Sequence, residues 1–195
     1  MQTNDTPADS LRERLIDTGV TLVDTEGAAA LSLREIARRA GVSHGAPRRY
    51  FPTHLELLSA IARRGFEQLG ERITRALADG GRDPRTQVAT LARVYLDFAA
   101  RNRGMYELMF RHDLLESGEL GLRETSLPLF QVLTELVAAA RLDTTPAVVA
   151  GALWANLHGV AQLWGWGSLQ LAVSGEDIEP LLAAVLDAHL GPEPR

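Results

Sequence analysis

The sequence predicts an all-α protein of about nine helices, and three observations lead to that fold class. Apolar residues recur at the three- and four-residue spacing of helices along nearly all of the 195 residues. Capping residues followed by proline, or by glutamate three residues later, mark several helix starts. No segment indicates a strand convincingly, because the β-prone VTLV at 20–23 lies inside a helical pattern that can override its propensity.

The first two helices are marked at both ends. Thr6-Pro7 offers an N-cap followed by proline at the first helical position, and Gly27 is expected to stop this helix. Ser32 and Glu35 form a capping box, in which the serine oxygen accepts the Glu35 amide and the glutamate reaches back. The short helix that follows ends at Gly41, which can take a positive φ.

The middle of the chain carries one long helix and one of ordinary length. A second capping box at 53–56 opens the long helix, which ends near 80–81. Asp83-Pro84 starts the next helix, which breaks at 102–104. A short apolar piece, MYELMF, follows at 105–110. We expect the long helix to join an N-terminal part of the chain to a larger C-terminal part.

The C-terminal third is predicted to contain three helices after one irregular stretch. Residues 113–121 are expected to form a loop or a frayed turn. Pro128 lies early in a helix that runs to about residue 142. Thr145-Pro146 caps another helix, which frays around 165–167, and a last apolar helix follows it.

The charge of the chain is uneven. The net charge is −5, yet residues 34–64 hold seven arginines against Glu35 and Glu56, which gives this segment +5 and leaves −10 for the rest. An acidic body with one basic face fits a polyanion bound at one place. The alternative is a solvated, arginine-rich surface that binds nothing.

Composition excludes several classes of site. The chain has no cysteine, so it has no disulfide, no thiolate metal site and no cysteine nucleophile. The N-terminus MQTNDTPADS lacks the build of a signal peptide, and no apolar run approaches the roughly 18 residues of a membrane span. We therefore expect a cytoplasmic protein without membrane contact, cofactor or metal.

Residues 33–52 form a candidate helix-turn-helix. A short helix at 33–40 is followed by a Gly41-Val42 turn and by a second short helix at about 44–50, which Ser43 can cap. In such a motif the second helix enters the major groove of DNA, where arginine binds guanine edges or phosphates. Pro47 lies inside the second helix, where it should cost only the first intrahelical hydrogen bond.

Two stretches resemble a known family. REIARRAGVSHGAPRRYFPTHLELL resembles the DNA-binding domain of the tetracycline-repressor (TetR) family of transcriptional regulators, and the resemblance covers roughly residues 10–68. WANLHGVAQL at 154–163 resembles the Trp-His-Gly signature of one C-terminal ligand-binding group in that family. Two departures stand out: Arg48 and Arg49 replace an aromatic pair or Tyr-His, and His54 replaces a lysine.

The resemblance implies an all-helical homodimer that releases a palindromic DNA operator when a small effector binds. Its domains would be a helix-turn-helix DNA-binding domain at 1–55 (motif at about 33–52), a connecting helix at 53–80, and an effector-binding and dimerisation domain at 82–190. Enzymatic activity is not expected. The effector would be neutral or lipophilic, with one or two polar groups, because the residues available to line its pocket are apolar and aromatic.

Three sets of candidate site residues follow from the motif, the resemblance and the helical periodicity. The candidate DNA-binding residues are Ser32, Arg34, Ser43, His44, Gly45, Ala46, Arg48, Arg49, Tyr50 and His54. The candidate effector pocket draws on Tyr95, Phe98, Met105, Tyr106, Met109, Phe110, Leu133, Trp154, Leu157 and His158. The candidate dimer interface is the stripe of Ile178, Leu181, Leu182, Val185 and Leu186 on the last helix.

Other interpretations of the same residues remain open at this point. Residues 41–45, GVSHG, match the G-x-S-x-G nucleophile elbow of serine hydrolases, which requires a preceding strand. His158 could be a general base, although such a histidine is more often a satisfied core residue. A helical protein-interaction module without DNA, or a helical DNA-binding protein without effector control, would also carry these patterns.

Overall fold

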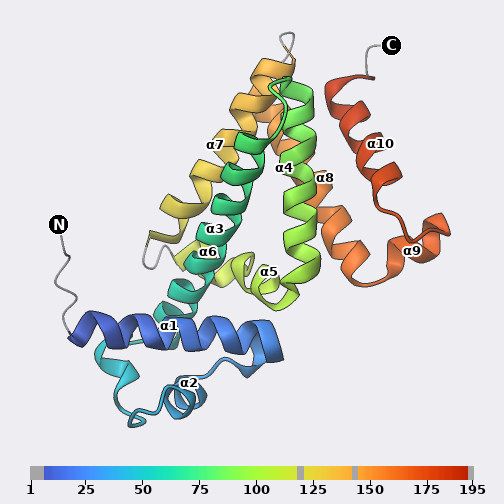
Figure 1. Ribbon diagram of the computed structural model, residues 1–195. Helices are drawn as coiled ribbons and strands as arrows, with labels where there is room; N and C mark the ends of the chain where they lie inside the picture. The colour runs from blue at the N-terminus through green and yellow to red at the C-terminus, as the bar shows by residue number, and fades with distance from the viewer. Residues whose placement is uncertain (1–6, 118–120, 142–144, 193–195) are drawn as a thin grey trace. The chain divides into compact units, whose positions relative to one another are not determined.

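The computed structural model describes residues 7–117, 121–141 and 145–192, and these ranges contain helices and no strand (Figure 1). Ten α-helices and two 3₁₀ helices, η1 and η2, occur in the described ranges. The predicted all-α class is therefore confirmed, and VTLV at 20–23 lies within a helix. The described part of the chain contains ten α-helices instead of about nine. None of these is long and apolar enough to cross a membrane.

The chain divides into two compact units that interleave along the sequence. Unit 1 comprises residues 1–67 and 102–126, and unit 2 comprises residues 68–101 and 127–195. The chain therefore passes from one unit to the other three times. The predicted domain limits of 1–55, 53–80 and 82–190 stay a prediction.

Unit 1 is built from two pieces of chain. Its elements are α1 (Pro7–Glu26), η1 (Ala28–Ala30), α2 (Leu33–Arg39), η2 (Pro47–Arg49), the first half of α3 (His54–Asp79), α5 (Arg103–Met109) and α6 (His112–Ser117). Helix α1 lies close against α3, because a Cβ atom at Gly19 would be 2.3 Å from Ile61 Cδ1. The helix therefore has glycine at the point where the Ile61 side chain packs against it.

The second piece of unit 1 packs tightly on the first. A Cβ atom at Gly104, in α5, would lie only 2.3 Å from the carbonyl oxygen of Val23 in α1. The sulfur atoms of Met105 and Met109, both fully buried, fill the space beside Gly65 of α3 in the same manner. Helix α5 thus belongs to the core of the N-terminal unit, although residues 68–101 of unit 2 separate it in the chain from the first piece of unit 1.

Unit 2 holds the rest of the helices. They are the second half of α3, α4 (Pro84–Arg101), most of α7 (Leu122–Ala140), α8 (Pro146–Gly165), α9 (Ser168–Val173) and α10 (Glu179–Leu190). Helix α4 packs on both α8 and α10, and α8 also packs on α9 and α10. Asp83 caps α4 as predicted, since its carboxylate accepts the Thr86 amide at 2.8 Å.

Several predicted boundaries are wrong. Residues 112–117 form α6 instead of a loop, because Leu114 is fully buried and packing overrides a weak local signal. The break after α4 is a single residue, Asn102, since α5 already begins at Arg103. Helix α8, by contrast, begins at Pro146 as predicted, although the Thr145 side chain forms no cap and the Thr145 carbonyl accepts the first amides of the helix instead. Residues 1–6, 118–120 and 142–144 lie outside the described residues.

Candidate nucleic-acid interface

Helix α2 begins where the capping box predicts. The Ser32 hydroxyl accepts the Glu35 amide at 3.1 Å, and Ser32 itself is extended, as an N-cap residue is. The other half of the box differs, because the Glu35 carboxylate binds two arginines of its own helix instead of reaching back to Ser32. Half of the predicted capping box is therefore confirmed.

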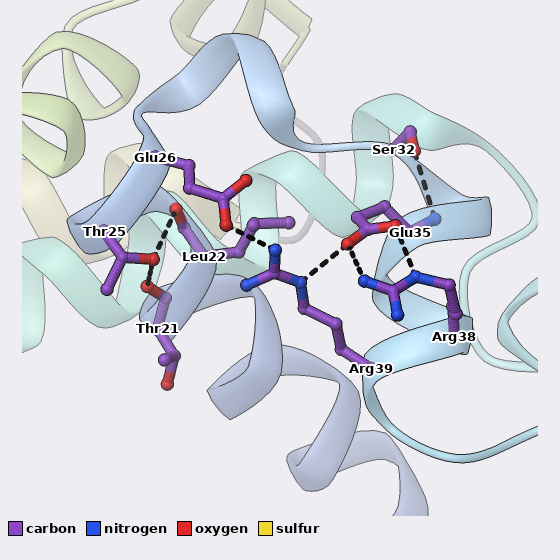
Figure 2. A network of polar contacts seen from close by, with 8 residues as sticks. All are labelled: Thr21, Leu22, Thr25, Glu26, Ser32, Glu35, Arg38 and Arg39. Atoms are coloured by element: carbon purple, nitrogen blue, oxygen red, sulfur yellow. Dashed lines mark hydrogen bonds and ion pairs between the residues drawn. The ribbon is translucent and has the colours of Figure 1, made fainter.

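Figure 2 shows the Glu35 carboxylate between two guanidinium groups. Arg38 donates to it from Nε at 2.9 Å and from Nη2 at 2.6 Å, and Arg39 donates from Nε at 2.7 Å. These bonds lower the pKa of Glu35 to about 2, and they raise the pKa of Arg38 and of Arg39. Arg39 also binds Glu26 at the end of α1, which joins the two helices.

The turn after α2 follows the prediction, but the helix beyond it does not. Gly41 has a φ of +68°, and the Val42 amide bonds back to the Ala37 carbonyl at 3.0 Å, which closes α2. Only a 3₁₀ turn, Pro47–Arg49, occurs where an α-helix was predicted at 44–50. The GVSHG segment thus follows a helix instead of a strand, so the context that a hydrolase elbow requires is missing in the described residues.

Pro47 explains the missing helix. An α-helix starting after Ser43 would need the residue-47 amide as donor to the Ser43 carbonyl, and proline has none. The proline ring would also clash with that carbonyl in an α-turn, so the chain forms three-residue turns, with the Ala46 amide donating to Ser43 at 3.0 Å. Pro47 itself is buried, which fixes this segment to the core.

The ten candidate DNA-binding residues all lie in unit 1, but their roles differ. Arg34, Arg48 and Arg49 are exposed, and the described residues offer them no hydrogen bond or ion pair. Exposed residues also include Ser32, Ser43, His44, Gly45 and His54, whereas Ala46 and Tyr50 are half-buried. The site is therefore a surface with three arginines available for a polyanion.

His54 has a structural partner that the sequence did not reveal. Its Nε2 atom donates to the carbonyl of Leu31 at 3.1 Å, which ties the start of α3 to the residue before Ser32. The Thr53 hydroxyl accepts the Glu56 amide at 3.1 Å, which confirms the predicted cap of α3. His54 thus holds two elements of the motif together, whatever else its ring contacts.

Two supporting arginines were missed altogether. Arg14 of α1 donates to the Ala40 carbonyl at 2.8 Å and so satisfies the end of α2. The Arg12 guanidinium lies 5.4 Å from the ring centre of Phe51, which is fully buried. Each pair is separated by more than 25 residues in the chain, so no local spacing could have indicated it.

The candidate effector residues are divided between the two units. Tyr95, Phe98, Leu133, Trp154, Leu157 and His158 belong to unit 2. Among these, the Tyr95 hydroxyl lies 2.9 Å from His158 Nδ1, and the Trp154 ring lies 6.1 Å from the imidazole. Burial lowers the pKa of His158, which favours a neutral ring at neutral pH.

The other four candidates are core residues of unit 1. Met105, Tyr106 and Met109 are buried there, and the half-buried Phe110 packs edge-to-face on Phe66 with 5.5 Å between ring centres. The methionine sulfurs pack beside Gly65. Their large apolar surfaces are thus already used by the fold of unit 1.

The predicted interface stripe packs inside its own chain. Leu182, Val185 and Leu186 are between 1% and 8% exposed in the single chain, because α10 packs on α4 and α8. Two ion pairs hold the same helix down: Arg85 with Asp187 at 2.5 Å and Arg93 with Glu179 at 2.9 Å. Ile178 and Leu181 are half-buried.

A capped short helix, a glycine turn and exposed arginines within an all-α chain are typical of helix-turn-helix regulators. Family comparison gives the same result. Residues 15–61 match the model of bacterial regulatory proteins of the tetR family, and residues 88–189 match the tetracyclin repressor-like C-terminal domain. The chain belongs to the tetracycline-repressor family.

One curated relative matches part of the chain at low sequence identity. The nucleoid occlusion factor SlmA of Aliivibrio fischeri (strain MJ11) is 31% identical over 98 residues, and the match covers 50% of each chain. The chain thus spans about half the length of that curated relative.

Two solved structures match over nearly the whole chain. A protein of unknown function from Rhodococcus sp. RHA1 is 27% identical with a TM-score of 0.80, over 96% of this chain and 97% of that one. The multidrug binding protein EbrR, complexed with imidazole, is 28% identical with a TM-score of 0.62, over 94% of this chain and 96% of its own.

Proposed function

We propose that this protein is a homodimeric, sequence-specific DNA-binding transcriptional regulator of the cytoplasm. In this proposal it is a repressor that a small lipophilic effector releases from a palindromic operator. The observation that carries the proposal is the set of three exposed arginines, Arg34, Arg48 and Arg49, on a helix-turn-helix whose frame is fixed by buried residues and caps. Membership of a family of regulatory proteins supports it.

DNA recognition would centre on η2 and the turn before it. Ser43, His44 and Gly45 present small or polar groups at an exposed turn, and Arg48 and Arg49 follow with long cationic side chains. Arginine binds guanine through two parallel hydrogen bonds and binds phosphate through charge. In a dimer, two such segments about 34–36 Å apart would meet successive major grooves on one face of the DNA.

The dimer would form through outward faces of α8 and α10. The leucine stripe of α10 serves the protomer, so the contact must use other residues. The exposed or half-exposed small residues on these helices include Gly151, Ala152, Ala155 and Gly159 on α8, with Ala183, Ala184 and Ala188 on α10. Small residues let helices approach closely, which suits a four-helix bundle across a two-fold axis. Apolar groups also lie exposed at the ends of α8, with Val148 68% and Trp166 62% exposed.

An effector site is proposed around the Tyr95–His158 pair. Trp154 and Phe130, whose ring centres are 6.2 Å apart, supply aromatic surface beside it. A neutral imidazole joined to a phenol offers one or two polar atoms in apolar surroundings, which favours a lipophilic ligand with few polar groups. The similarity to a multidrug binding protein fits this ligand class. Participation of the unit 1 residues Met105, Tyr106, Met109 and Phe110 stays a prediction.

Effector release would act through the three points where the chain passes between the units. One point lies within α3, one at Asn102 between α4 and α5, and one within α7. A ligand that displaced α4 would thereby act on α5, which packs against α1 through Gly104 and Val23. A typical coupling of about 1–3 kcal/mol would change DNA affinity by roughly 5–150-fold.

Selection of a duplex from a random pool tests the proposal. The purified protein should enrich a palindrome, bind it as a dimer, and lose affinity steeply as salt rises, because phosphate contacts release counterions. Absence of any enriched palindrome would contradict it. A DNA-binding protein without effector control is the second candidate, supported by the similarity to a nucleoid occlusion factor. That candidate predicts operator binding that no compound in a lipophilic panel reverses.

A further inference from the structure

The arginines of the basic segment fall into two groups with different surroundings. Four of the seven arginines in 34–64 bind carboxylates: Arg38 and Arg39 bind Glu35, and Arg63 and Arg64 bind Glu67. The remaining three have no such partner among the described residues. The positive charge that the sequence places on this face is therefore only partly available.

The pairing on α2 is unusual in its extent. One carboxylate, Glu35, accepts three hydrogen bonds from two guanidinium groups, and Glu26 of α1 holds the second of these from the other side (Figure 2). The four side chains sum to zero charge. The Arg38 side chain is 63% exposed, so it is held at the surface by its bonds and not by burial.

We propose that Glu35, assisted by Glu26, limits sequence-independent DNA binding by holding Arg38 and Arg39 away from the phosphates. The inference rests on the proposed DNA-binding function and adds a residue that sets specificity. The first helix of a helix-turn-helix crosses the DNA backbone, so arginines released on it would bind phosphates of any sequence. While Glu35 holds Arg38 and Arg39, DNA contacts are left to Arg34, Arg48 and Arg49. The last two of these lie in η2, where we place DNA recognition.

Replacing Glu35 with glutamine tests this directly. Glu35→Gln keeps the shape and the backbone amide that Ser32 caps, but it removes the charge that holds both arginines. Arg38 then has no carboxylate partner in the described part of the chain, whereas Arg39 keeps Glu26. One additional phosphate contact from Arg38 should steepen the slope of log affinity against log salt by about 0.9, and a second contact from Arg39 would bring this change to about 1.8. The ratio of affinities for a non-operator duplex between about 50 and 200 mM salt should then grow by about three- to tenfold. Operator affinity should rise less, so the operator preference should fall.

Glu67→Gln is the matched control. Glu67 also binds two arginines, Arg63 and Arg64, and its loss changes the net charge by the same amount. It lies on α3, outside the motif, so Glu67→Gln reports the general effect of one added positive charge. Glu35→Gln should exceed it clearly in both non-operator affinity and salt slope.

A second set of variants identifies the arginines responsible. Arg38→Ala with Arg39→Ala should change wild-type affinity little, yet it should abolish the gain caused by Glu35→Gln, which is a non-additive result. Glu26→Gln leaves Arg39 bound to Glu35 alone, so it should give a smaller gain of the same kind. Glu26→Gln also keeps the test decisive if Glu35→Gln fails to fold.

Two outcomes would overturn the inference. Glu35→Gln and Glu67→Gln could behave alike, or the paired alanine variant could weaken wild-type binding as much as Arg48→Ala does. The proposed function fails in a different way, since the wild type would then select no operator. If the wild type selects an operator but Glu35→Gln and Glu67→Gln bind DNA alike, only the role of Glu35 is rejected and the proposed function stands.

Discussion

Arg48 and Arg49 are neighbours in a 3₁₀ turn, where successive side chains leave the backbone about 120° apart. They therefore cannot both point at one base pair. If one of the two side chains faces the bases, the other is placed to contact a phosphate. The sequence correctly identified these arginines as exposed, but it placed them on an α-helix. The two roles proposed for them follow from the turn that Pro47 imposes.

Alanine substitution separates these roles. The arginine that faces the bases should cost about 1–3 kcal/mol of operator binding when replaced, with relaxed preference at one base pair. The other should weaken all duplexes alike and reduce the salt slope by about 1. Binding titrations over a set of single-base operator variants measure both effects. Arg75→Ala, an exposed arginine in unit 2, is the control, and wild-type affinity in both single variants would place recognition elsewhere.

The lowered pKa of His158 predicts a stability change with pH. The fold favours the neutral imidazole, so its contribution is present above the unfolded pKa of about 6.5 and is lost as the pH falls toward the lowered value. Urea unfolding at about pH 7.5 and pH 5.5 should show a lower midpoint at the acidic pH. His158→Gln should reduce that difference and can keep a hydrogen bond to Tyr95. An unchanged difference would mean that another group titrates.

At the scale of elements, prediction worked where a capping side chain marks the start of a helix. The starts of α2, α3 and α4 follow from a serine, a threonine and an aspartate, each of which accepts an amide three residues later. It failed at 44–50 for a local reason, because the cost of Pro47 to an α-turn was set too low. It failed at 112–117 because the burial of Leu114 depends on packing partners that lie elsewhere in the chain.

The last helix shows a related limit. The stripe of Leu182, Val185 and Leu186 correctly indicates that one face of α10 is covered. Periodicity does not say whether the covering surface belongs to the same chain or to a second copy. The structure gives the first answer, with α4 and α8 as neighbours.

Two glutamate variants on α10 distinguish its two faces. Leu182→Glu places a charge in the core of unit 2 and should lower the free energy of unfolding by more than about 3 kcal/mol. Ala184→Glu lies on the exposed face, so it should leave the protomer folded and weaken the dimer. Circular dichroism measures the loss of folding stability, and light scattering measures the loss of the dimer. A folded Ala184→Glu dimer of unchanged mass would place the contact on another surface.

At the scale of the whole molecule, the interleaving of the two units determines which fragments of the chain can fold independently. The first 80 residues carry the entire motif, but they lack α5, whose Met105 and Met109 fill the space beside Gly65. A fragment of residues 1–80 should therefore unfold without a sharp thermal transition. Joining residues 102–126 to residues 1–67 through a flexible linker should restore cooperative melting and duplex binding. Cooperative melting of the shorter fragment would show that α5 is dispensable.

The contact of Gly104 with the Val23 carbonyl also bears on how relatives of this protein exchange parts. A gene crossover just after codon 67 could join this α1 to a foreign α5, and any residue bulkier than glycine at position 104 would then collide with the Val23 carbonyl. Exchange of α5 between relatives is therefore restricted to those that carry glycine at this position. In the proposed regulator, new operator preferences should arise mainly by codon changes within 32–50, where most side chains are exposed and the frame beneath them stays fixed.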